Sequence, residues 1–214
     1  MSLDGKVRRR LQQALAVVDE HGTTGPRLVQ DAKRVWARVQ KLIRMNVLAT
    51  DPDIEALELA CHAMQLPQKQ TRMAIGKLGR TNLRQRAENA AEMLINVIGE
   101  DVDESLLDRT ARLLHETPQK QPMLEEARLL ADAINLDDFG SVGLLALAMQ
   151  LSLLGDGPGE LADACAKRDE YGYWEARLKD GFHFDVVRKM AQQRLQAARE
   201  VTRTLVDELS EGAL

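Results

Sequence analysis

Aromatic residues, cysteines and long apolar runs are all scarce in this chain of 214 residues, and each scarcity excludes a class of protein. Aromatic residues make up only 3% of the sequence, which argues against binding of single strands by base stacking. Cys61 and Cys165 are too few for a disulfide framework or a four-sulfur metal site, and both lie in alanine-rich segments typical of packed helices. The longest apolar run, residues 142–149, is too short to span a bilayer.

The sequence also has no excess of positive charge. Its 29 basic and 33 acidic residues give a net charge of −4, so no general surface for nucleic acid is indicated. One local basic cluster, residues 6–10 (KVRRR), is expected to be a solvated helix face. With no signal-peptide pattern, we expect a cytoplasmic protein that binds neither membranes nor nucleic acid.

What the chain does contain is helical periodicity in nearly every segment, without a convincing strand pattern. We predict an all-α fold: an N-terminal helix and linker over residues 1–25, then one helical domain over residues 26–214. Glycine, proline and capping residues predict helices over residues 3–20, 82–98, 104–115, 141–154 and 185–209, with others starting at Pro26, at Asp51-Pro52 and at Pro122. The last helix carries a long apolar stripe, which either packs within the domain, the preferred interpretation, or forms a homodimer.

The densest acidic group follows an amphipathic pattern in residues 124–140, LEEARLLADAINLDDFG. Asp132, Asp137 and Asp138 could bind a metal or could shape a turn and cap a helix. Upstream, His115 and Glu116 end an apolar helix. An imidazole and carboxylates can together hold a divalent cation that activates water, whereas a helix-end histidine beside a solvated glutamate is the plainer alternative.

The other chemical motifs are weak. His62 lies beside Cys61 in a segment that looks buried, where a core histidine is the simpler interpretation. The glycine-rich residues 155–159 (GDGPG) lack the lysine and serine of a phosphate-binding loop, and no nucleophile elbow or dinucleotide motif is present. We assign no catalytic residue from these motifs.

Residues 122–143, PMLEEARLLADAINLDDFGSVG, resemble a motif of the HD superfamily, the all-helical metal-dependent phosphohydrolases, in its small bacterial branch. The resemblance covers about residues 27–205 and implies a single HD-type helical domain with an added N-terminal helix. In that family the first aspartate of the motif is a metal ligand, and it corresponds to Asp132. The upstream histidine of that branch corresponds to His115 or a close neighbour.

The front half departs from the family's pattern. The family's first histidine lies three residues before Arg-Val-Trp, and here Asp31 holds that position. The His-Asp doublet falls on Met64-Gln65, or on His62-Ala63 if the alignment shifts by two residues. A second, less favoured alignment places the doublet on His115-Glu116. A thioether and a neutral amide are poor ligands for a hard divalent ion, so the site is expected to be degenerate.

This resemblance implies a ligand-binding or regulatory module that has lost catalysis. Its metal ligands would be Asp132, Asp31 and His115, and its pocket residues Met64, Gln65, His62 and Glu116. The alternative is an active phosphohydrolase with altered ligands, in which a metal-bound hydroxide attacks a nucleotide or other phosphoester. Mn, Mg, Ni or Fe would be the metal, no other cofactor is expected, and a small phosphorylated molecule is the expected ligand.

Overall fold

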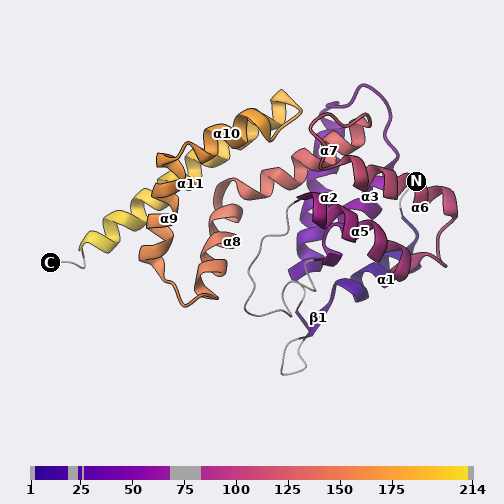
Figure 1. The fold of residues 1–214 in the computed structure, drawn as a ribbon, viewed down its shortest axis with the longest axis horizontal. Helices are drawn as coiled ribbons and strands as arrows, with labels where there is room; N and C mark the ends of the chain where they lie inside the picture. Colours follow the sequence, from indigo (N-terminus) through magenta and orange to yellow (C-terminus); the bar gives the residue numbers. More distant parts are fainter. Residues whose placement is uncertain (1–2, 19–23, 26, 68–82, 212–214) are drawn as a thin grey trace. The chain divides into compact units, whose positions relative to one another are not determined.

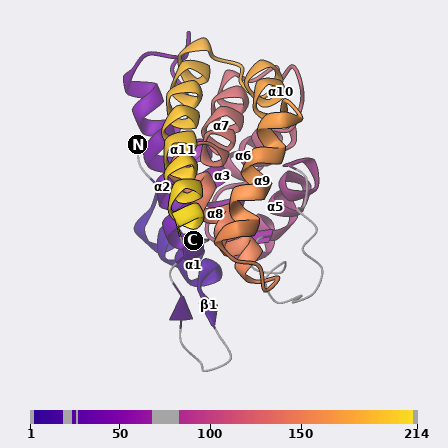
Figure 2. The same cartoon turned by 90° about the vertical axis from the view of Figure 1, so that its left-hand side faces the viewer.

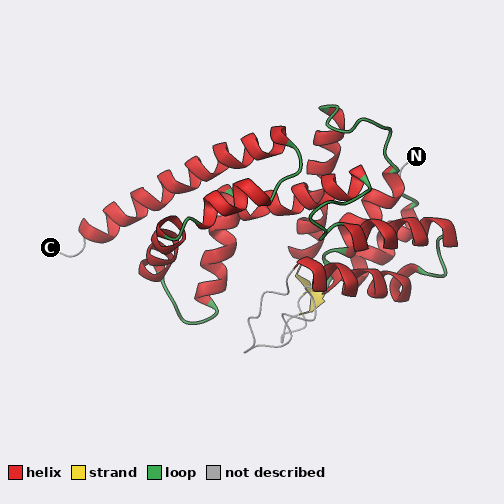
Figure 3. Ribbon diagram, turned by 45° about the horizontal axis from the view of Figure 1, so that its top comes forward, coloured by secondary structure: helices red, strands yellow, loops and turns green. Residues whose placement is uncertain are grey.

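The computed structural model describes residues 3–18, 24–25, 27–67 and 83–211, and within them the fold is all-α (Figures 1 and 3). The chain divides into two compact units, Met1–Ala131 and Asp132–Leu214. The sequence prediction placed its only boundary after residue 25. The described part of the chain contains no helix that is both long and apolar enough to cross a membrane.

Among its described residues, the first unit contains five whole helices, a short β pair and most of a sixth helix. These elements are α1 (Gly5–Leu15), β1 (Val17–Val18), β2 (Thr24–Gly25), α2 (Arg27–Arg44), α3 (Ile54–Ala63), α5 (Leu83–Ile98), α6 (Glu104–Glu116) and α7 (Glu125–Asn135), whose last residues lie in the second unit. Helix α3 is central, because it packs against α2, α5 and α6 and is buried at every position from Ala56 to Ala63.

The N-terminal helix is shorter than the sequence predicts. It begins with Asp4, whose carboxylate accepts the N–H groups of Lys6 and Val7, and it ends at Leu15 rather than near residue 20. Ala16 is extended, and Val17 and Val18 then pair antiparallel with Gly25 and Thr24. Consecutive β-branched valines favour extended backbone, which explains the early end of the helix. Residue 20, where the predicted helix ends, lies outside the described residues.

The basic cluster at residues 6–10 is exposed at Lys6, Arg9 and Arg10, as predicted, but three of its side chains also form ion pairs. Lys6 and Arg10 both pair with the largely buried carboxylate of Asp101, and Arg8 pairs with Glu58 at 2.7 Å. These ion pairs fix α1 to α3 and to the turn after α5. Leu3, Val7, Leu11 and Leu15 complete the attachment on the buried face.

The second unit is built on the long C-terminal helix. Its elements are η1 (Leu136–Asp138), α8 (Gly140–Ser152), α9 (Pro158–Glu170), α10 (Tyr173–Asp180) and α11 (Asp185–Glu211). Helix α11 packs against α8, α9 and α10, and Figure 2 shows it in yellow beside α9 and α10. Val187, Ala191 and Leu195 are its buried residues, whereas Val201 and Leu209 are exposed. The rings of Phe139, Trp174 and Phe182 form a core cluster, with centroids 5.1 and 5.4 Å from Phe139.

Gly143 allows the start of α8 to fit against the preceding turn. A Cβ at this position would lie 2.1 Å from the backbone oxygen of Asp138. We therefore expect Gly143→Ala to lower the free energy of unfolding by about 3 kcal/mol, because backbone must move to relieve the overlap. Urea denaturation measures this loss.

Gly159, in the first turn of α9, gives the matched control. A Cβ there meets nothing within 4 Å. Gly159→Ala should be neutral or stabilising by about 0.5 kcal/mol, since alanine has the higher helix propensity. If Gly143→Ala and Gly159→Ala lower the free energy of unfolding equally, the close packing at Gly143 is contradicted.

Candidate functional site

The three predicted metal ligands each have a separate structural setting. Asp31, on α2, forms ion pairs with Arg34 at 2.9 Å and with Arg27 at 3.9 Å. His115 is exposed on α6, and Asp132 is buried in α7. Across residues 3–18, 24–25, 27–67 and 83–211, no group of three or more His, Cys, Asp or Glu side chains could hold a metal ion. The predicted metal trio therefore gains no support from the structure.

Asp132 anchors the start of α11. Its Oδ1 accepts the backbone N–H of His183 at 2.8 Å, and its Oδ2 accepts that of Phe184 at 2.9 Å, directly before the helix begins. Burial raises the pKa of this carboxyl to about 7, while the two N–H donors and the charge of Arg188 act in the opposite direction. Both carboxylate oxygens are thus engaged in holding the loop that leads into α11.

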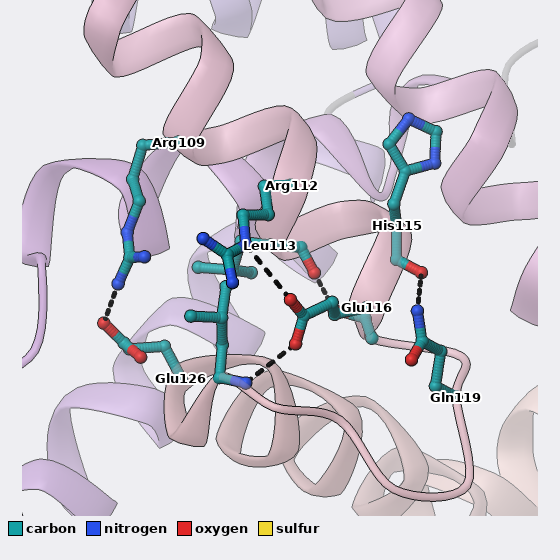
Figure 4. A network of polar contacts seen from close by, with 9 residues as sticks. Arg109, Arg112, Leu113, His115, Glu116, Gln119 and Glu126 are labelled. Atoms are coloured by element: carbon teal, nitrogen blue, oxygen red, sulfur yellow. Dashed lines mark hydrogen bonds and ion pairs between the residues drawn. The ribbon is translucent and has the colours of Figure 1, made fainter.

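His115 and Glu116 point in different directions (Figure 4). The Glu116 carboxylate accepts the N–H of Leu124 at 2.7 Å and the Nε–H of Arg112 at 3.2 Å. Burial opposes its ionisation, but these bonds outweigh burial and hold the pKa of Glu116 below its ordinary value. Nearby, Arg109 donates to Glu126 at 2.6 Å. The network closes the turn between α6 and α7, which is a structural role.

The remaining predicted pocket residues are packed in the core of the first unit. His62 is buried, its Nδ1 lies 2.9 Å from the backbone oxygen of Glu58, and burial lowers its pKa. Met64 is fully buried and Gln65 nearly so. The backbone oxygen of Met64 accepts the Nε–H of Arg86 at 2.7 Å. None of His62, Met64, Gln65 and Glu116 lines the groove described below.

A groove of about 340 Å³ lies within the second unit, among α8, α9, α10 and α11. Its volume falls within the range of small-molecule sites. Most of its wall is apolar or small, formed by Gly140, Gly143, Leu144, Leu147, Ala162, Cys165, Ala166, Trp174, Leu195, Ala198, Thr202 and Val206. The charged lining residues are Asp138, Arg168, Asp169, Arg199 and Arg203.

Both acids of the groove are already neutralised by arginine. Arg177 pairs with Asp138, and Arg199 donates two hydrogen bonds to Asp169 and one to Glu175. Arg168 is held differently, with its guanidinium 5.3 Å from the ring centroid of Tyr173 and 5.6 Å from that of Trp174. The groove therefore combines an apolar wall with arginine groups at its edge.

Sequence reasoning did not identify this groove. Its wall depends on small side chains at helical spacing, Ala162 and Ala166 on α9 and Ala198 and Thr202 on α11. Such spacing is visible in the sequence, but it is equally typical of closely packed helices. Only the packed structure distinguishes a gap between helices from a tight contact.

Comparison with known proteins identifies no relative: no protein-family model, curated protein or solved structure matches the chain.

Proposed function

We propose that this chain is a helical binding module, and that its ligand occupies the groove among α8, α9, α10 and α11. The observation that carries the proposal is the groove itself, whose apolar wall ends in a few charged groups. Concave sites with mostly apolar walls and a small number of polar groups are typical of small-molecule binding.

Binding accounts for the groove's chemistry better than catalysis does. Its two carboxylates, Asp138 and Asp169, are each engaged in an ion pair with an arginine, so both are already used in contacts within the protein. Of the described residues that line the groove, none is a histidine. The resemblance to the HD superfamily favours binding over catalysis, because Met64 and Gln65 fall on that family's His-Asp doublet and are poor ligands for a hard divalent ion. These residues do not line the groove, so the resemblance does not bear on its location.

The test fills the groove and measures binding of an uncharged apolar fluorophore, N-phenyl-1-naphthylamine. Ala198 lines the groove, and Ala198→Leu places three additional carbon atoms in the space. We expect this variant to weaken binding of the fluorophore at least about tenfold, because the added side chain occupies ligand volume.

Ala197→Leu is the matched control. Ala197 precedes Ala198 on α11, is exposed, and is not among the groove-lining residues. The control should bind the fluorophore as the wild type does. Failure of the wild type to bind, or equal weakening in the two variants, would contradict the proposed site.

A further inference from the structure

Two arginines at the edge of the groove have no carboxylate partner in the part of the chain that the structure describes. They are Arg168 on α9 and Arg203 on α11. The groove's other cation, Arg199, is paired with Asp169 and Glu175. The charged groups of the groove that remain available to a ligand, Arg168 and Arg203, are therefore positive.

Arg168 is also positioned for binding an anion. Its guanidinium carbon lies over the rings of Tyr173 and Trp174 in a cation–π contact, which restrains the side chain. A guanidinium carries five N–H donors, and their geometry matches that of a carboxylate. Leu144, Leu147 and Leu195 line the same groove as Arg168 and supply an apolar wall.

We propose that the groove binds an anionic amphiphile, a molecule with an apolar chain and one terminal carboxylate, with Arg168 and Arg203 at the groove edge holding the carboxylate. This inference rests on the proposed function, since it names the class of ligand for the same groove. Charge complementarity selects the anion, and the apolar wall selects the chain.

The experiment displaces N-phenyl-1-naphthylamine from the full chain with octanoate, octanol and octylammonium, which share a chain length and differ in charge. We expect octanoate to displace the fluorophore at a concentration about tenfold lower than octanol, and octylammonium to be the weakest. In the double variant Arg168→Gln, Arg203→Gln, the preference for octanoate over octanol should disappear, while the fluorophore still binds.

Lys167→Gln is the matched control, because Lys167 is an exposed neighbour of Arg168 on α9 and does not line the groove. It should retain the octanoate preference. If the fluorophore binds and Ala198→Leu weakens it, but octanoate and octanol compete equally, the ligand class is wrong and the binding site stands. If the wild type does not bind the fluorophore, the proposed function itself fails.

A second copy of the chain is the other occupant that the test distinguishes. If a second copy fills the groove, fluorophore binding should weaken as protein concentration rises, and sedimentation should show a dimer over the same range. That result would overturn the assignment of an anionic amphiphile.

Discussion

Replacing Arg8 with methionine should lower the stability of the first unit by about 3 kcal/mol, the loss typical of breaking a buried ion pair from one side. Arg8 donates two hydrogen bonds to one oxygen of Glu58, from Nε at 3.0 Å and from the terminal nitrogen at 2.7 Å. The Glu58 side chain is only 3% exposed, whereas that of Arg8 is 38% exposed. Removing Arg8 therefore leaves a buried carboxylate whose remaining hydrogen-bond partner, among the residues that the structure describes, is the N–H of Leu3 at 3.4 Å.

Substitution of the partner residue, Glu58, should lower the stability less than substitution of Arg8 does. Glu58→Gln leaves Arg8 with a neutral acceptor and with access to water, so we expect a loss of about 1–2 kcal/mol. The double variant Arg8→Met, Glu58→Leu should recover part of the loss, because it leaves no buried charge behind. Hydrogen exchange of α1 and α3 peptides in the full chain measures these changes in the unit that contains them.

Arg9→Met is the control for the loss of one positive charge from the same helix. Arg9 is exposed, and its substitution should change exchange in α3 very little. If Arg8→Met and Arg9→Met have the same effect, the ion pair with Glu58 does not fix α1 to α3.

The second large effect concerns Asp132 and its dependence on pH. An ordinary aspartate has a pKa of 3.8, whereas burial raises the pKa of the folded Asp132 to about 7. The folded state therefore holds this proton more tightly than the unfolded state does. The corresponding stability is fully present below about pH 4 and is lost as pH rises to about 7, by an amount on the order of 4 kcal/mol.

Asp132→Asn removes this titration. Because the asparagine amide group can accept only one of the two N–H groups of His183 and Phe184, we expect the variant to be less stable than the wild type at pH 5. The difference in free energy of unfolding between the wild type and Asp132→Asn should become smaller toward pH 8. Urea denaturation at several pH values, followed by Trp174 fluorescence in a Trp36→Phe background, measures this difference in the second unit. If the difference instead grows as pH rises, the carboxylate is ionised in the folded state.

Helix positions follow from local signals, so most of them could be predicted from the sequence. The predicted helices over residues 104–115 and 185–209 correspond to α6 and α11, within two residues at each end. Asp103 caps α6 by accepting the N–H of Leu106 at 3.0 Å. Helix α3 begins at Ile54 and is capped by Asp53, which accepts the N–H of Ala56 at 3.0 Å, so the prediction of a cap at Asp51-Pro52 was wrong by two residues. Capping and periodicity involve neighbours along the chain, and the sequence displays them directly.

Long-range partners could not be predicted, since no local pattern specifies them. The acids of residues 132–138 suggested a metal or a turn, but Asp132 binds backbone N–H groups 51 and 52 residues away. Asp138 pairs with Arg177, 39 residues away. The basic cluster of α1 likewise pairs with Glu58 and Asp101, which are distant in the sequence and come close only in the folded chain. Each of these charges becomes a structural contact, and Asp132, Glu58 and Asp101 are also largely buried.

The groove is the central claim, and fluorophore binding by the paired leucine variants of α11 tests it most directly. Ala198 lines the groove and Ala197, one position earlier, does not. We predict that Ala198→Leu weakens binding of N-phenyl-1-naphthylamine at least about tenfold and that Ala197→Leu leaves it unchanged. Equal affinities in the two variants would show that the groove is not the binding site.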